Sequence, residues 1–400
     1  MKTAVAITPE IDDIELAARE LASQVREKLE FKRNSVCIAY CDAEMDVAGL
    51  GELLHADLGI DIVGLTTTAT IERHAGYNDM GVLLSVLTAD DVDFSVGSTG
   101  ELDGDSFQSG IRKAYEDARA RIQEEPKLIL IMAPYNVDLS SDNYVEALDE
   151  VSGGVPVFGG VAADHYNLMN QKTFYNGQSY SRGLVFLLIA GNVRPVFSLE
   201  HHFKAKVEKR GVVTKSTKNL VERMDNQTFK EFVASMVPVP DEENVIYQFQ
   251  STPFVMELPD FEEDEQPVLR ELCDLNHETG AGGFLSKMPE GSRLYLSVFE
   301  LDNLSQSCDG ALSKLVGQLA EKSDYEYSMV FISTCNGRHI LMGGVKTLES
   351  DIVSERLRGF PPELNAVGFY AFGEMCPTGK RANGIAKNRF HNISFALCAI

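Results

Sequence analysis

Short apolar runs recur along the chain, and segments with a helical spacing of apolar residues lie between most of them. The clearest runs are 35–40, 127–132 and 183–190. An almost unbroken apolar run is typical of a strand that is buried on both faces of a sheet. Helical apolar stripes occupy 11–29, 43–57, 105–123 and 141–149. Strands that alternate with helices predict an α/β or mixed α+β fold, with mixed parallel and antiparallel sheets flanked by helices.

Length and composition allow two hydrophobic cores. The chain has 400 residues, of which 44% are hydrophobic. A chain of this length and composition can form more than one ordinary hydrophobic core. A second unit starts near residue 205. We therefore predict two domains, 1–204 and 205–400.

The chain is strongly acidic, with a formal net charge of −24. Such a charge repels phosphate backbones and anionic lipid surfaces, so we expect no nucleic acid among its partners. No apolar run reaches 18 residues, which argues against membrane insertion. The seven cysteines are scattered and form no Cys-x-x-Cys pair, so a disulfide framework is not expected. Together these features predict a cytoplasmic protein.

An internal echo links the two halves of the chain. Residues 36–41 resemble 330–335, and each segment ends in a cysteine. Downstream, 62–71 resembles 366–375, where a Val-Gly strand enters a turn of small residues. The echo is compatible with a duplicated sheet unit and equally with coincidence between two α/β halves.

The segment Cys335-Asn-Gly-Arg338 follows a strand-like run near the C-terminus. Asn-Gly is a strong turn signal, and a turn here would direct the thiol and the guanidinium toward one space. Arginine beside a thiol lowers its pKa and offers a fork for a carboxylate. Alternatively, Cys335 is a small buried residue and Arg338 anchors a structural carboxylate such as Glu349.

The segment 368–374 is aromatic, bracketed by glycines, and ends in Glu374. Glycine allows a ligand or a backbone to approach closely, so Tyr370 and Glu374 are candidate ligand contacts. His391 and Asn392, which precede the last apolar run, could close the same cavity. The alternative is an ordinary core strand followed by a structural histidine.

Two turns in the N-terminal half offer further polar groups. Thr66 and Thr67 belong to a run of threonines after a strand, and Gly160 and Asp164 follow another strand. Hydroxyl groups and a carboxylate at strand ends suit a small polar ligand, although threonine is also a good strand residue. The glycines lack the spacing of a dinucleotide fingerprint, and the histidines form no helical metal pair. We therefore expect no metal.

Taken in order, these segments resemble the FIST domain family, whose members have an N-terminal and a C-terminal half. The resemblance spans nearly the whole chain. It rests on 64–71, 159–164, 176–177 and 183–185 in the first half, and on 288–293, 335–338, Glu349, 368–374 and 391–392 in the second. The first half departs from the family turn, because Leu65, Ala69 and Thr70 replace a cysteine, a glycine and a glutamate. A carboxylate contact at position 70 is therefore lost.

The resemblance implies a sensory module for a small ligand, for which amino acids have been proposed. In this hypothesis Arg338 pairs with a ligand carboxylate and Glu374 or Asp164 receives an ammonium group. Many family members are fused to signalling domains; this chain has no residues left for one, so it implies an output partner in trans.

Three alternatives stay open. Some family relatives bind haem and report nitric oxide, so haem is a possible cofactor, although no axial histidine can be assigned. An enzyme would use Cys335 as the nucleophile, Arg338 to lower its pKa and His391 as the base. A purely structural partner protein could dock through the acidic stretch 241–266, which has nine acidic residues and no Lys or Arg.

Overall fold

The computed structural model describes the chain except for residues 104–105, 137–138, 240–248, 250, 263–264, 299, 323 and 382. For residues 204–208 only the backbone is described. In this part of the chain, no helix is both long and apolar enough to cross a membrane.

Three six-stranded sheets share one strand order and one pattern of strand directions. In each sheet the third and fourth strands are parallel, and every other neighbouring pair is antiparallel. Sheet 1 has the order β1-β6-β2-β3-β10-β11, sheet 2 has β7-β12-β8-β9-β24-β25, and sheet 3 has β13-β26-β22-β23-β4-β5. This agreement reveals a threefold internal repeat.

Each repeat runs strand, helix, strand, helix, strand, hairpin, strand along the chain, except that the third repeat has two helices in place of the second one. The first comprises β1 (Lys2–Thr8), α1 (Ile14–Lys28), β2 (Asn34–Asp42), α2 (Val47–Leu58), β3 (Asp61–Thr67), β4 (Thr70–Glu72), β5 (Gly76–Asn78) and β6 (Val82–Ala89). The second comprises β7 (Val92–Glu101), α3 (Phe107–Arg119), β8 (Pro126–Ala133), α4 (Asp142–Ser152), β9 (Val157–Val161), β10 (Thr173–Tyr175), β11 (Gln178–Tyr180) and β12 (Gly183–Gly191). The third comprises β13 (Val196–Glu200), α7 (Leu301–Glu321), β22 (Met329–Cys335), α8 (Asn336–Met342), α9 (Leu348–Leu357), β23 (Asn365–Ala371), β24 (Glu374–Lys380), β25 (Ala386–His391) and β26 (Phe395–Ala399).

The hairpin of every repeat joins a sheet of another repeat. β4–β5 extends sheet 3, β10–β11 extends sheet 1, and β24–β25 extends sheet 2. The three repeats therefore cannot separate without breaking backbone hydrogen bonds. Strands from either side of residue 204 share sheets 2 and 3.

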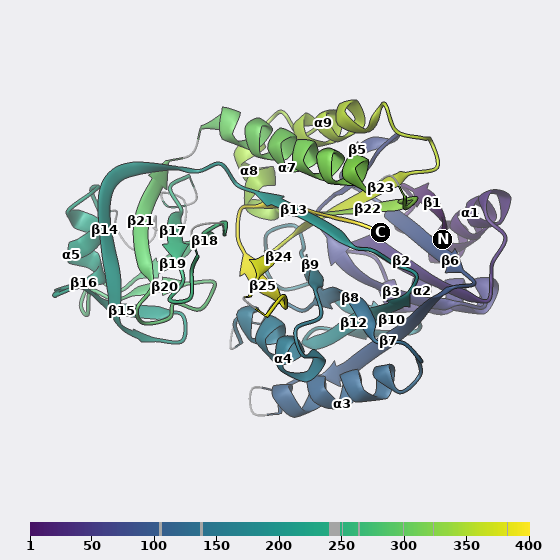
Figure 1. Ribbon diagram of the computed structural model, residues 1–400, viewed down its shortest axis with the longest axis horizontal. Helices are drawn as coiled ribbons and strands as arrows, with labels where there is room; N and C mark the ends of the chain where they lie inside the picture. Colours follow the sequence, from purple (N-terminus) through teal and green to yellow (C-terminus); the bar gives the residue numbers. More distant parts are fainter. Residues whose placement is uncertain are drawn as a thin grey trace.

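The sheets enclose a central core, and helices cover their outer faces (Figure 1). Side chains from all three sheets, among them Tyr40, Phe158 and Phe369, form one apolar cluster. Helices α1 and α2 pack on sheet 1, α3 and α4 on sheet 2, and α7 and α9 on sheet 3. Burial on both faces explains why the strands read as nearly continuous apolar runs.

Local signals set the ends of several helices. The side chain of Asp13 accepts a hydrogen bond from the backbone of α1, and Asp46 does the same for α2. Such caps satisfy amides that have no partner inside the helix. Gly59 ends α2 in the left-handed conformation, with φ of 70°.

A small β domain is inserted in the third repeat, between β13 and α7, where the other repeats have a short loop. It comprises β14 (Lys204–Thr217), β15 (Leu220–Met224), β16 (Gln227–Thr228), α5 (Phe229–Ala234), β17 (Phe254–Glu257), β18 (Val268–Arg270), β19 (Leu272–Leu275), β20 (Gly282–Phe284) and β21 (Arg293–Val298). Its own core includes Phe229, Phe254 and Phe284. Figure 1 shows the inserted domain as a separate lobe beside the three-sheet body.

The structure confirms the predicted fold class, and it places the echoing segments in equivalent strands. Residues 36–41 belong to β2 and 330–335 to β22, the first strand of each parallel pair. The strands β3 and β23 complete these pairs. The equivalent pair β8–β9 adds a third copy that lacks the cysteine and the Val-Gly sequence, so the sequence comparison missed it.

Candidate functional site

The carboxyl ends of the three parallel pairs meet at one end of the body. Thr68, just after β3, donates its hydroxyl hydrogen to the backbone oxygen of Asp164 over 2.7 Å. The Nδ2 of Asn336, just after β22, donates to Oγ1 of Thr68 over 2.6 Å. Ligands of α/β proteins are held at such ends. The predicted site residues from both halves of the chain are therefore brought to one region.

Asp164 organises the loop between β9 and β10. Its carboxylate is fully buried and accepts hydrogen bonds from four backbone amides, those of 167–170, over 2.8–3.1 Å. Tyr166 and Leu168 in this loop have φ of 68° and 57°. Because its bonding capacity is used within the loop, Asp164 supports the local backbone rather than facing an open space.

The two predicted threonines also make internal contacts. Oγ1 of Thr66 accepts a hydrogen bond from the amide of Lys172 over 2.9 Å. Thr67 donates to the backbone oxygens of Ala69 and Tyr370, each over 2.8 Å. These hydroxyl groups hold the crossing of β3 into β4 against β23.

Arg338 is fully buried and bound on several sides. Its Nε donates to Oε1 of Glu349 over 2.7 Å, Nη1 donates to Oγ of Ser307 over 2.9 Å, and Nη2 donates to the backbone oxygen of Leu304 over 3.1 Å. Oε2 of Glu349 accepts from Thr334 over 3.0 Å. This network fixes α8 against α7 and α9, and it occupies the guanidinium group that a ligand carboxylate would need.

Tyr370 lies on the helix-covered face of sheet 3, beside His339. The two rings meet edge to face with centroids 4.9 Å apart. Nε2 of His339 contacts the hydroxyl of Tyr77 over 2.8 Å, and Nδ1 contacts the hydroxyl of Tyr166. Burial lowers the pKa of His339 to about 4. This aromatic group is thus neutral at physiological pH.

Glu374, Gly160 and His391 form a row across three neighbouring strands. Glu374 pairs with Gly160 on β9 and with His391 on β25, so the three positions share one face of sheet 2. A Cβ atom at Gly160 would lie 2.8 Å from Oγ of Ser333. The row therefore faces the end of β22, which carries Ser333 and Cys335.

The row and the adjoining end of β22 hold several buried polar atoms that are not fully paired. Oε1 of Glu374, both ring nitrogens of His391, Oγ of Ser333 and Oδ1 of Asn336 have no well-formed hydrogen bond among the described residues, although the Cys335 thiol lies close to Glu374 and the backbone of Cys376 close to His391. Oε2 of Glu374 accepts from the amide and the hydroxyl of Ser394, over 3.0 and 2.6 Å. Unpaired buried polar groups are costly, and their gathering in one place marks a site where a ligand would complete the bonding.

The protonation states of the row follow from its burial. Burial raises the pKa of Glu374 to about 8, an effect that the hydrogen bonds from Ser394 offset only in part. Burial, and then the positive charge of Arg270, lower the pKa of His391 well below its usual value. Near neutral pH, Glu374 thus holds a proton and His391 carries no charge.

The Cys335 thiol lies in surroundings that disfavour the thiolate. Burial first, then the carboxyl groups of Glu374 and Glu271, raise its pKa well above the usual value. Reactive cysteines have the opposite environment, exposed and electropositive. Cys335 is therefore an uncharged thiol beside Glu374 and Glu271.

The inserted domain covers this end of the body. Oε1 of Glu271 would lie 3.7 Å from a Cβ atom at Gly337, and burial of its carboxyl group raises the pKa of Glu271 to about 7. Ser286 donates to Oδ1 of Asn392 over 2.7 Å. Asn392 thus connects the body with the inserted domain.

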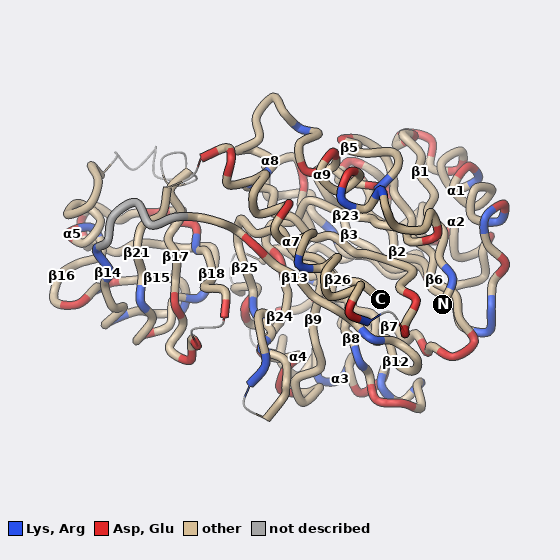
Figure 2. The backbone as a smooth tube through the Cα atoms, turned by 45° about the horizontal axis from the view of Figure 1, so that its top comes forward, with Lys and Arg blue, Asp and Glu red and all other residues tan. Residues whose placement is uncertain are grey.

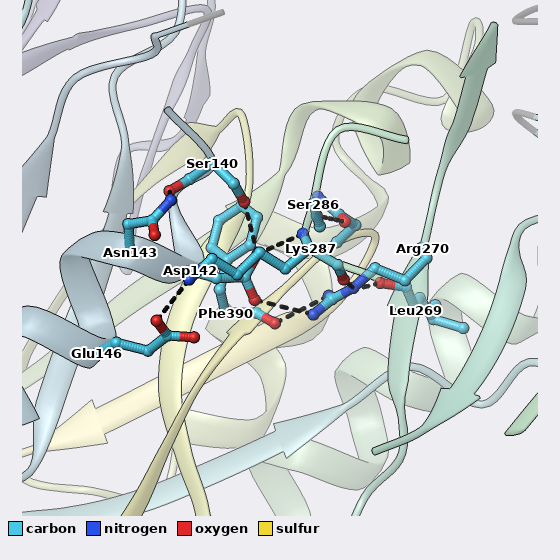
Figure 3. A network of polar contacts seen from close by, with 10 residues as sticks. Ser140, Asp142, Asn143, Glu146, Leu269, Arg270, Ser286, Lys287 and Phe390 are labelled. Carbon is cyan, nitrogen blue, oxygen red and sulfur yellow. Dashed lines mark hydrogen bonds and ion pairs between the residues drawn. The ribbon is translucent and has the colours of Figure 1, made fainter. Parts of the chain in front are cut away.

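A second network fastens the inserted domain beside the row (Figure 3). Arg270 is almost fully buried; Nη1 donates to the backbone oxygen of Phe390 over 3.1 Å, and Nη2 lies 3.0 Å from Oδ1 of Asp142. The amide of Lys287 donates to Oδ2 of Asp142 over 2.9 Å. Two cavities flank this network, one of about 630 Å³ that includes Tyr135 and Cys273, and one of about 270 Å³ that includes Arg389.

Part of the acidic stretch 241–266 is bound within the molecule. Lys387 on β25 pairs with Glu262 over 3.0 Å and with Glu265 over 3.3 Å, and Arg389 pairs with Asp260 over 2.8 Å. Residues 240–248, 250 and 263–264 lie outside the described residues. The described acidic groups here thus join the inserted domain to sheet 2.

Metal ions and haem each require a particular set of donor groups. The described residues contain no group of three or more His, Cys, Asp or Glu that could hold a metal ion. His391 and Cys335 are buried beside two carboxyl groups, which does not fit the apolar pocket with an accessible axial ligand that haem requires.

The family comparison agrees with this architecture. Residues 35–227 match the FIST N domain and residues 229–377 match the FIST C domain. The chain therefore belongs to the FIST family, whose domains are small-ligand sensory domains of signal transduction. No curated protein matches the chain.

Sequence reasoning missed three residues of this region. Asn336 lies inside the Cys-Asn-Gly-Arg segment, where the Asn-Gly pair indicates only a turn. Ser333 and its neighbour Thr334 follow the apolar residues 329–332, and Glu271 follows Arg270 in the run 268–272. Polar residues within an otherwise apolar run are the signal that could have found the last two.

Proposed function

We propose that the protein is a cytoplasmic sensory receptor for a small ligand that carries an ammonium group, of which amino acids are the best example. The ligand binds where the body meets the inserted domain, against Glu374, His391 and Cys335. A signalling partner in trans reads the bound state. Domain junctions are common places for small-molecule sites.

The observation that best supports this proposal is the unpaired Oε1 of buried Glu374 beside the unpaired ring of His391. An ammonium group is the partner that a buried carboxylate lacks, because it supplies both charge and hydrogen bonds. Ser333 and His391 can donate or accept hydrogen bonds next to it. A zwitterion thus finds an acceptor and donors within one cluster, whereas Arg338 stays bound to Glu349.

Burial of Glu374 and His391 also suggests how binding becomes a signal. Neither side chain is exposed to solvent, so a ligand enters only when the inserted domain moves away from the body. The chain passes between the body and the inserted domain twice, after β13 and before α7. Ligand contacts to both parts would then bias the equilibrium between an open and a closed arrangement.

A thermal-shift panel tests the proposal. Each amino acid is compared with the 2-hydroxy acid of the same skeleton, which lacks the ammonium group. We expect at least one amino acid to raise the melting temperature, its hydroxy analogue to have a much smaller effect, and Glu374→Gln to abolish the response.

The exposed Glu30→Gln serves as the matched control and should keep the response. A panel without any shift would contradict the proposal. So would a shift that Glu374→Gln leaves unchanged.

A further inference from the structure

An exposed apolar patch lies beside the aromatic group around His339. Of the eight large apolar side chains that are exposed in the described part of the chain, six belong to it, and Met169 is the most exposed, at 79%. The patch consists of Met80, Tyr166, Leu168, Met169, Ile340 and Val345. Soluble proteins rarely leave so many apolar side chains together without a partner.

Three segments from three different parts of the chain are joined here. The Tyr166 hydroxyl contacts His339, which is next to Ile340 on α8. Asp79, next to Met80, pairs with Lys346, next to Val345, over 3.6 Å. The three segments that carry the six side chains therefore lie side by side.

The backbone of the loop in the patch is held in a conformation that costs free energy. Tyr166 and Leu168 both adopt positive φ, which non-glycine residues avoid. The four amide bonds to Asp164 hold this shape. In this conformation the side chains of Leu168 and Met169 are exposed to solvent.

The charges around the patch indicate what covers it. The chain carries a net charge of −24, and Figure 2 shows acidic residues on both the body and the inserted domain. At the patch, by contrast, Asp79 is paired with the cation Lys346. Across a twofold axis Lys346 of each copy can face Asp79 of the other, so the patch is complementary to itself. An anionic membrane is disfavoured by the acidity of the chain.

We propose that this patch is the contact between two copies of the chain in a twofold symmetric dimer. α8 begins at Asn336, among the unpaired groups of the ligand region, and its end lies in the patch. The short helix therefore joins the dimer contact to the ligand region. The dimer does not depend on the identity of the ligand.

Analytical ultracentrifugation of the full chain tests the dimer. We expect the wild type to dimerise at micromolar concentration and Met169→Asp to weaken the dimer roughly tenfold or more. Leu301→Asp is the matched control, because Leu301 is exposed and apolar but lies outside the patch. It should dimerise like the wild type.

A charge-exchange experiment tests the symmetry. Asp79→Lys and Lys346→Asp each place like charges opposite each other in a homodimer, so each variant alone should be mainly monomeric. Mixed together they should form a heterodimer, because both facing pairs then have opposite signs. The exposed intramolecular pair contributes little to folding, so both variants should stay folded, which thermal unfolding checks.

A wild type that stays monomeric would overturn the proposal. A dimer that survives Met169→Asp would place the contact elsewhere and overturn it as well. The absence of a heterodimer in the mixture would overturn the twofold pairing of Lys346 with Asp79.

Discussion

Two buried polar clusters lie on opposite faces at the end of β22, and they differ in how fully their atoms are paired. Around Arg338 and Glu349 the guanidinium and the carboxylate are bound by one another and by hydroxyl and backbone groups. Around Glu374 and His391 several atoms have no well-formed hydrogen bond among the described residues. The first cluster is part of the framework, whereas we propose that the second binds the ligand. Pairing, and not residue type, separates the two roles.

The largest expected effect concerns the unpaired cluster and is a pH dependence. The pKa of Glu374 is about 8 in the folded chain, against about 4.3 in the unfolded chain. At pH values between these two, the carboxyl group is protonated in the folded state and ionised in the unfolded state. Stability should therefore fall as the pH rises through this window, by on the order of 5 kcal/mol.

Glu374→Gln should remove this part of the pH dependence. Chemical denaturation of the wild type and of Glu374→Gln, repeated from pH 5 to pH 9, measures the pH dependence of the free energy of unfolding in each. A parallel pH dependence in the two proteins would show that Glu374 is charged and paired in the folded chain.

The paired cluster should respond to loss of either charge. Arg338→Met leaves Glu349 buried without its cation, and we expect a loss of about 3 to 5 kcal/mol in the free energy of unfolding. The double variant Arg338→Met with Glu349→Leu should lose less, because no unpaired charge remains. Denaturant unfolding measures both, with the exposed pair Arg26–Asp57 as a control worth less than about 1 kcal/mol. Equal losses in the free energy of unfolding at the buried and the exposed pair would contradict the structural role of the buried one.

Asp164 tests whether a fully bonded carboxylate can be replaced by its amide. Asp164→Asn keeps the shape but turns one acceptor into a donor that faces two backbone amides. We expect a loss of roughly 2 to 3 kcal/mol and weaker dimerisation, since the loop presents Tyr166 and Met169. Unfolding and sedimentation of the same sample check both effects. An unchanged dimer would separate the loop shape from the patch.

Gly160 gives the smallest effect. A Cβ atom there would lie 2.8 Å from both Ser333 and Ala371, so Gly160→Ala should cost roughly 1 to 2 kcal/mol by overpacking. Because Gly160 pairs with Glu374, the substitution should also displace Glu374 and reduce the thermal shift from an amino acid. Gly317→Ala is the control, because a Cβ atom at Gly317 would meet open space. Gly59→Ala is unsuitable as a control, because Gly59 has a positive φ.

The sequence predicts the sheets better than their connections. Long apolar runs such as 127–132 identify central strands, because burial on both faces demands them. The hairpin strands at 70–72 and 76–78 have three residues each, too few for a periodic pattern, and their partners are distant in sequence. The inserted domain separates β13 from α7 and so hides the third repeat.

The candidate site was predictable in its composition but not in its pairing. Cys335, Glu374, His391 and Gly160 are brought together at one end of the body. Arg338 has the same guanidinium group as a ligand-binding arginine. Only the three-dimensional structure reveals that this group is paired with Glu349. Spacing along the chain cannot show whether a buried group has a partner.

The most direct test of ligand binding at Glu374 is the number of protons exchanged when an amino acid from the thermal-shift panel binds. Isothermal titration near pH 7, repeated in buffers of different ionisation enthalpy, counts them. We expect the wild type to release most of one proton, because the ammonium group displaces the proton of Glu374, and Glu374→Gln to release none. Binding without proton release, or release that persists in Glu374→Gln, would contradict ligand binding at Glu374.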